Sequence, residues 1–319
     1  MGHQSAFIVV SIPQLMIASP VDGPIDVPGV PRYMRDIVLH STIGSGIAIT
    51  VAAKQIFLFD FAKDPQGASL GERRLELPPD KGYAVVARRL KVMNAFALCL
   101  HGSHLMMGKS YQHPFKLAPE DLLHPEGGTT GAGSKAAISR TILETAPVHD
   151  QLISGEVIES AVNLLDQILK HPDSYALEIA SLINDALVAS TAQEYAQAVV
   201  MAWSACEFLL ERKWLECCEE VSNRKLGKAL SRKKREYYEG RDYSASLILE
   251  ILWFQDVLGT DLYESLTKVR KMRNDWIHGI KIPDHDTANL AVVLALGMYA
   301  DAFGISIVAR PGVLEYYLP

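Results

Sequence analysis

The sequence predicts an α+β protein in which a small β-rich N-terminal domain precedes an all-helical bundle. Short β-rich runs separated by proline and glycine dominate up to about Asp80, whereas helix signals dominate from about residue 150 to Phe303. A length of 319 residues favours two domains rather than one. We therefore expect domains at residues 1–110 and 150–319, joined by a glycine- and proline-rich linker or loop at 111–149.

The expected elements follow from the hydrophobic pattern along the chain. Runs rich in β-branched and aromatic residues predict strands, and apolar residues at helical spacing predict helices. In chain order, the expected strands are Phe7–Ile12, Ile37–His40, Ile47–Val51 and Ile56–Phe61. The expected helices are Tyr83–Met106, Gln193–Cys217, Leu247–Leu258, a helix ending at Gly279, and Thr287–Phe303.

Bulk composition limits the classes of function. The formal net charge of −6 argues against a protein that binds nucleic acid over its whole surface, so any RNA contact must be local. The four cysteines lack the spacing of a disulfide framework, which indicates reduced thiols. The first residues lack a positive n-region, and the apolar run Leu290–Ala300 is shorter than the roughly 20 residues that span a bilayer. We expect a cytoplasmic protein without a membrane partner.

Three motif-like stretches do not support a cofactor or a hydrolase site. Gly127–Lys135 resembles a phosphate-binding loop but lacks its closing Gly-Lys-Ser/Thr. Cys99, His101 and His104 are close in sequence, but a zinc site needs about four ligands and no second cluster exists. No Gly-x-Ser-x-Gly elbow accompanies the serines. The sequence therefore predicts neither a metal nor a cofactor.

The stretch Lys268–Gly279 is the one that indicates chemistry. At about 100° per residue, Leu262, Leu266, Val269, Trp276 and Ile277 share an apolar stripe, and Arg273 lies near its middle. A buried arginine needs a carboxylate, a subunit interface or an anionic ligand. His278 lies about 140° round the helix from Arg273, so a regular helix in a monomer cannot bring them together. Gly279 is expected to stop the helix, and a two-fold dimer could supply a second copy of the pair.

These residues resemble the motif of a known family. Arg273-x4-His278, with Asn274 directly after the arginine, resembles the Arg-x(4-6)-His motif of HEPN domains, whose arginine is typically followed by a polar residue. The order of elements is also similar: a long helix with Trp203 and Glu207, a basic connector, two further helices and a closing apolar helix. The resemblance covers roughly the last half of the chain.

The resemblance implies a fold and an activity. Many HEPN proteins are metal-independent ribonucleases that act as dimers, and others only bind RNA or mediate assembly. For this chain it implies an RNA substrate, a homodimer, and products that end in a 2′,3′-cyclic phosphate and a 5′-hydroxyl. Stress response, toxin activity and antiviral defence against phage would suit the family.

Chemical roles can be assigned to the residues of the motif. A histidine titrates at about pH 6.5, so His278 suits general acid/base work at neutral pH. Arg273 would hold phosphoryl oxygens as a bidentate donor, and Asn274 would orient the histidine or the phosphate. Lys268 and Arg270, in the same stretch, are further candidates for RNA binding.

A basic connector precedes the motif. Seven cations occur between Arg224 and Arg235 before the first acid, Glu236, and two tyrosines follow it directly. Such residues can hold phosphates and stack on unpaired bases, or they can simply form a solvated helix face. The RNA-binding candidates here are Arg232, Lys233, Lys234 and Arg235.

Other interpretations stay open at this point. Glu207 lies on the flank of the apolar stripe of its helix, where it could pair with Arg273 or be an ordinary boundary glutamate. The resemblance adds that HEPN-like domains often carry an acidic residue in this helix. The helical half could also be a catalytically inactive module for RNA binding or dimerisation. In that case Arg273 is an interface salt bridge, and the N-terminal domain is a sensor that binds an unknown activator or partner.

Overall fold

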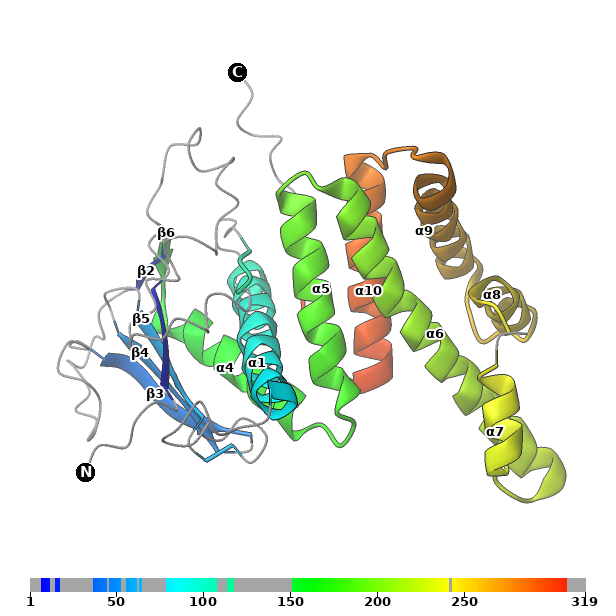
Figure 1. The fold of residues 1–319 in the computed structure, drawn as a ribbon, viewed down its shortest axis with the longest axis horizontal. Coiled ribbons are helices and arrows are strands. Elements are labelled where there is room, and N and C mark those ends of the chain that lie inside the picture. The colour runs from blue at the N-terminus through cyan, green and yellow to red at the C-terminus, as the bar shows by residue number, and fades with distance from the viewer. Residues whose placement is uncertain are drawn as a thin grey trace. The chain divides into compact units, whose positions relative to one another are not determined.

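The computed structural model has the α+β architecture that the sequence predicts (Figure 1). It describes residues 7–11, 15–17, 37–44, 46–52, 56–61, 63–64, 79–107, 114–117, 151–240 and 243–308. The chain divides into two compact units, Met1–Val188 with Ile307–Ala309, and Ala189–Ser306 with Arg310–Pro319. The boundary between the two units therefore falls within helix α5 (Tyr175–Thr191). The predicted linker at 111–149 lies outside the described residues except for 114–117, so its position stays a prediction.

A four-stranded antiparallel sheet forms the centre of the first unit, with the strand order β1-β5-β4-β3. Its strands confirm the four predicted ones: β1 (Phe7–Ser11), β3 (Ile37–Ile43), β4 (Ile47–Ala52) and β5 (Ile56–Asp60). Every residue of β4 except Ala48 is buried, because this strand has neighbours on both sides. A separate parallel pair joins β2 (Leu15–Ile17) to β6 (Gln151–Ile153).

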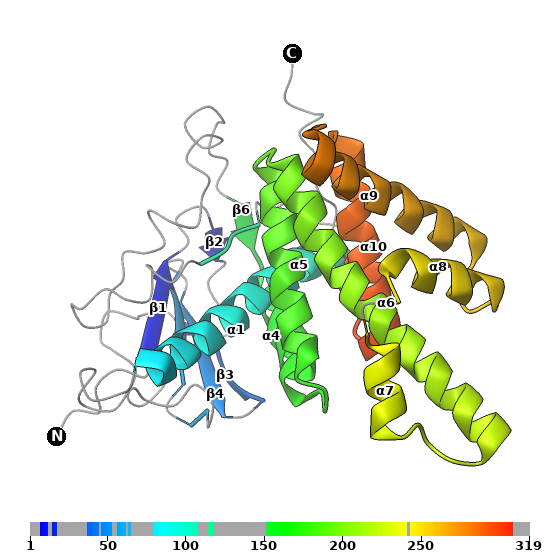
Figure 2. The same cartoon turned by 45° about the vertical axis from the view of Figure 1, so that its right-hand side comes forward.

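Helix α1 (Pro79–Met106) covers the sheet through an aromatic cluster and confirms the helix predicted from Tyr83. The Phe96 ring meets Phe57 and Phe59 edge-on, with centroids 5.7 and 5.3 Å apart. Helix α4 (Gly155–Lys170) lies beside α1 in both overall views and also packs on β3 (Figures 1 and 2). The sheet and these two helices enclose the core of the first unit.

The turn between β3 and β4 fixes α4 to the sheet. The Gly44 backbone N–H donates to Asp166 Oδ1 over 2.7 Å. Gly44 has φ +51°, and a Cβ there would lie 2.6 Å from the Leu169 Cβ. Glycine is required at this position because both the backbone conformation and the close approach of α4 exclude a side chain.

The second unit is helical. It contains α6 (Tyr195–Leu226), α7 (Arg232–Tyr238), α8 (Ala245–Phe254), α9 (Thr260–Gly279) and α10 (His285–Phe303), and α5 (Tyr175–Thr191) ends in it. Helices α6 and α10 form the most extensive helix–helix contact of this unit, in which Trp203 and Tyr299 are fully buried. Helix α9 packs on both α6 and α10, and α8 contacts α6 and α9. The helices predicted around the motif are confirmed, and α6 runs further than expected, to Leu226.

None of the helices within the described ranges is both long enough and apolar enough to cross a membrane.

We expect Phe96→Ala to lower the free energy of unfolding by about 3–5 kcal/mol, because it removes a ring from a fully packed aromatic cluster. Met106→Ala is the matched control on the same helix, because the Met106 side chain is 49% exposed. This substitution should change the free energy of unfolding by less than about 0.5 kcal/mol. Urea unfolding followed by circular dichroism measures both. Equal losses in the two variants would contradict the packing described for α1.

Candidate functional site

The candidate motif lies in the last turns of α9, where the buried stripe of this helix loses its cover. Leu266 and Val269 are fully buried. Further along, Arg273 and Trp276 are only half-buried, and Ile277 is 45% exposed. The place of Trp276 on the apolar stripe predicts a core residue, and the structure corrects this, because the helix leaves the core before it ends. The motif therefore lies at the edge of the bundle.

Two arginine side chains follow the buried residues on this stripe. Arg273 Nη1 donates to Asn274 Oδ1 over 3.0 Å. The Nε atoms of Arg270 and Arg273 are buried and have no hydrogen-bond acceptor, and neither side chain forms an ion pair with any described residue. A buried donor without an acceptor typically costs about 1–3 kcal/mol. An anion bound here would offset that cost.

His278 is exposed in the last turn of α9. The helix is continuous through Gly279, so Arg273 and His278 leave it in directions about 140° apart. The two side chains of a single chain therefore cannot contact the same phosphate, as the helical spacing predicts. Asn274, by contrast, lies beside Arg273 and contacts it.

Helix α9 ends at Gly279, as the sequence predicts, but the residue after it closes the helix in an unusual way. Gly279 is still helical, and Ile280 adopts the left-handed conformation with φ 55°, its N–H donating to the Trp276 carbonyl. A β-branched residue is strained in this region. The Ile280 side chain is 76% exposed, so packing within the described residues does not offset the strain. The predicted end of the helix at Gly279 is thus confirmed, but the left-handed residue that closes it is Ile280 rather than a glycine.

Glu207 on α6 does not pair with Arg273. No ion pair or hydrogen bond joins the two side chains within the described part of the chain. Burial raises the pKa of the nearby Glu211 carboxyl, and the negative charges of Glu207 and Glu239 raise it further. Glu207 therefore lies near another carboxylate, that of Glu211, and no contact with Arg273 among the described residues supports its suggested role.

The remaining RNA-binding candidates fall at two places in the second unit. Lys268 is exposed and Arg270 half-buried on α9, and Arg232, Lys233, Lys234 and Arg235 are exposed on α7. Figures 1 and 2 place α7 beside the C-terminal half of α6, and the motif end of α9 at the opposite end of this unit. The α7 cations and Arg273 therefore cannot hold the same phosphate of one RNA within one chain.

A polar cluster that the sequence analysis missed lies at the start of α10, directly after the motif. Ser190 Oγ donates to Asn289 Oδ1 over 2.9 Å, and the Asn289 amide approaches the His285 ring at 3.0 Å. The ring of Tyr195 meets His285 edge-on at 5.8 Å. The run Asp284-His285-Asp286 was the available signal. Hydrogen bonds from Thr287 lower the pKa of the Asp284 carboxyl, which caps α10, and the positive charge of Lys268 lowers it further.

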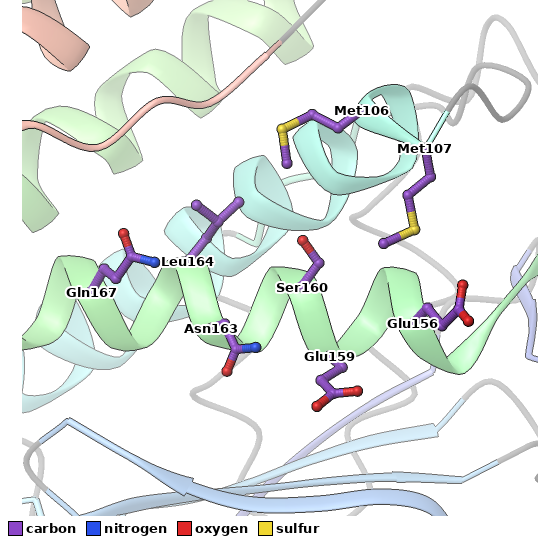
Figure 3. A pocket seen from close by; sticks show the side chains of 8 residues that line it. All are labelled: Met106, Met107, Glu156, Glu159, Ser160, Asn163, Leu164 and Gln167. Carbon is purple, nitrogen blue, oxygen red and sulfur yellow. The ribbon is translucent and has the colours of Figure 1, made fainter.

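The first unit contains an open groove of about 540 Å³ (Figure 3). Met106 and Met107 from the end of α1 face Ser160 and Leu164 of α4 across it, and Glu156 lies at its rim. The ionisable groups in it are exposed carboxylates. The described residues that line the groove thus include no histidine, lysine or arginine, unlike the motif in the second unit.

The cysteine and the two histidines that were considered as zinc ligands lie on buried positions of α1. Cys99, His101 and His104 are at most 2% exposed. Burial raises the pKa of the Cys99 thiol, which keeps it protonated. Within the described ranges no group of three His, Cys, Asp or Glu side chains could hold a metal ion.

Comparison of the chain with protein-family models, with curated proteins and with solved structures gave no match. The resemblance to HEPN domains therefore depends on the motif and on the order of the helices alone.

We expect Ile280→Gly to raise the free energy of unfolding by about 1 kcal/mol, because glycine adopts φ 55° without the steric cost of a branched side chain. Ile282→Gly is the matched control, because this side chain is 70% exposed and its backbone is not left-handed. It should be neutral or slightly destabilising. Chemical denaturation at low protein concentration compares the two, and a less stable Ile280→Gly variant would contradict the strain.

Proposed function

We propose that this protein is a metal-independent endoribonuclease whose site forms between two protomers of a homodimer. The observation that carries the proposal is the pair of guanidinium groups on α9, Arg270 and Arg273, whose buried Nε donors have no acceptor in the part of the chain that the structure describes. They lie one to two turns from an exposed histidine, His278. A phosphodiester would supply the missing acceptors.

The chemistry needs only a proton-transfer group and cationic donors, because RNA carries its own nucleophile. The 2′-hydroxyl attacks the neighbouring phosphorus, and the bond from phosphorus to the 5′-oxygen breaks. His278 removes the proton of the 2′-hydroxyl, and a histidine returns a proton to the 5′-oxygen, which leaves as a hydroxyl. Arg273 stabilises the charge on the phosphoryl oxygens, and Asn274 holds the Arg273 guanidinium through the bond described above. The products are a 2′,3′-cyclic phosphate and a 5′-hydroxyl.

Two features support a composite site across a two-fold axis. Arg273 and His278 point in different directions from one regular helix, so a second copy must supply one of them. Ile277, Ile280 and Ile282 are 45%, 76% and 70% exposed around the same helix end. Apolar side chains gathered beside polar ones are typical of interfaces. An isologous contact here would cover them and bring each histidine to the partner's arginine.

A second candidate is a catalytically inactive module for RNA binding or dimerisation. The bond from Arg273 to its own neighbour Asn274 favours it, because a guanidinium held in this way can serve a structural contact. Stress response and defence against phage remain proposals under either function.

We expect purified protein to cleave mixed RNA at a rate that an excess of chelator leaves nearly unchanged, because no step requires a metal ion. His278→Ala should reduce the rate by about 10²- to 10⁴-fold, the usual contribution of general acid/base catalysis. The matched control is His171→Ala, which changes a half-buried histidine of the first unit. Strict dependence on Mg²⁺ or Mn²⁺ would rule out the mechanism.

We also expect two inactive variants to restore activity when they are mixed. In a dimer of one Arg273→Leu protomer and one His278→Ala protomer, one of the two composite sites keeps both functional residues. Random mixing should therefore recover about a quarter of the wild-type activity. The measurement is RNA cleavage after the two proteins are unfolded and refolded together, beside each variant treated alone.

Thermal melts are the control for this complementation. Arg273→Leu places an apolar side chain on an apolar stripe, and it strands no carboxylate, so its melting temperature should stay close to that of the wild type. A folded mixture that recovers no activity, although each variant still dimerises by light scattering, would exclude a site shared between protomers.

A further inference from the structure

A basic hairpin, residues 219–238, joins the end of α6 to α7. It contains seven cations and three carboxylates, in a chain whose net charge is −6. The cations, all exposed, are Arg224, Lys225, Lys228, Arg232, Lys233, Lys234 and Arg235. The basic hairpin therefore carries a net positive charge, whereas the chain as a whole is negatively charged.

Side-chain hydrogen bonds hold the basic hairpin in one conformation. Glu219 on α6 accepts from the Leu230 backbone N–H over 3.1 Å and from Arg235 Nη2 over 3.4 Å. Ser222 Oγ donates to the Lys228 carbonyl over 2.9 Å, and the Ser231 side chain caps α7. A binding surface that is ordered before it meets a ligand loses less conformational entropy on binding.

Two of the α7 cations have carboxylate partners and two do not. Arg232 pairs with Glu236 over 2.8 Å, and Arg235 pairs with Glu219. Lys233 and Lys234 form no ion pair with any described residue. Their ammonium groups are thus available to an external anion without breaking an internal contact.

A cluster of aromatic rings lies at the end of α7. Trp214 of α6 contacts Tyr238 and Tyr243, with centroids 5.9 and 5.4 Å away. Tyr237 packs edge-on against both tyrosines, yet 58% of it remains exposed. Burial raises the pKa of the Tyr243 hydroxyl, and its hydrogen bond with Tyr237 raises it further. The Tyr237 ring is therefore fixed by its neighbours and presented to solvent three positions after Lys234.

We propose that the basic hairpin is a docking site for single-stranded RNA, in which Lys233 and Lys234 hold phosphates and Tyr237 stacks on an unpaired base. Stacking on an aromatic ring needs an exposed base face, which a duplex does not offer. A ring beside unpaired cations therefore selects single strands. The inference rests on the proposed function, because it takes RNA as the substrate, and it adds the class of RNA and the place where the strand is held.

The test uses the full-length His278→Ala protein, so that cleavage does not disturb binding. Fluorescence anisotropy measures its affinity for a labelled single-stranded RNA and for the same RNA paired into a duplex. We expect the single strand to bind at least about tenfold more tightly. Tyr237→Ala should weaken single-strand binding by at least about fivefold, and Tyr237→Phe should retain it, because the stacking ring is preserved.

Replacing Lys233 and Lys234 together by alanine should weaken binding and lower the slope of log Kd against log salt by about 1.4, the value for two single-strand phosphate contacts. Both side chains are exposed and unpaired, so this variant should keep its fold. Matched controls lie in the first unit: Tyr175→Ala, where the ring is 51% exposed, and Lys63→Ala with Lys170→Ala. These should leave the affinity and the salt slope unchanged.

Equal affinity for duplex and single strand would overturn the proposal, as would an unchanged affinity in both the Tyr237→Ala variant and the double-lysine variant. Tighter binding to anionic lipid vesicles than to RNA would assign the basic hairpin to a membrane surface instead. The proposed function fails separately. A wild-type protein that binds single strands through Tyr237 but cleaves none would remove the nuclease and leave the docking site.

Discussion

The candidate site depends on one face of α9. This face packs in the core at one end and carries two guanidinium groups at the other. Leu266 and Val269 occupy the inner part of this face and hold the helix against α6 and α10. Arg270 and Arg273 follow on the same face, with buried Nε atoms that have no acceptor among the described residues. An apolar residue at either position would pack without this cost. The arginines are therefore better explained by a ligand or a second protomer than by the stability of one chain.

Most of the helices and strands could be predicted because their boundaries depend on local patterns. The strands of the four-stranded sheet and helices α1, α8, α9 and α10 have a clear periodicity and recognisable turns. The pairing of β2 with β6 could not be predicted, because three residues carry too little pattern and the contact joins distant parts of the chain. The left-handed residue that closes α9 could not be predicted for a different reason. Glycine is the usual left-handed residue after a helix, but here Ile280 takes that conformation and Gly279 stays helical.

Only those features of the candidate site that depend on the geometry of a single helix could be predicted from the sequence. A rotation of 100° per residue was enough to place Arg273 on the buried stripe and His278 away from it. The neighbours of Glu211, one turn after Glu207, were not predictable, because Glu239 approaches Glu211 from the end of α7, whose position depends on the chain reversing after Gly227. The same reversal brings Tyr238 and Tyr243 onto Trp214. Contacts made by a returning chain cannot be derived from the pattern of either helix alone.

The separation of the motif from the basic hairpin limits how their charges can act. They lie at opposite ends of the second unit, and α9 alone, with 20 residues, is about 30 Å long (Figure 2). Because the Debye length is about 8 Å at physiological ionic strength, the cations at one end barely affect the potential at the other. The positive charge of the basic hairpin therefore cannot stabilise a transition state at Arg273 of the same chain. In the proposed ribonuclease it would act only through an RNA strand that both regions hold at once, so its contribution would be one of binding rather than chemistry.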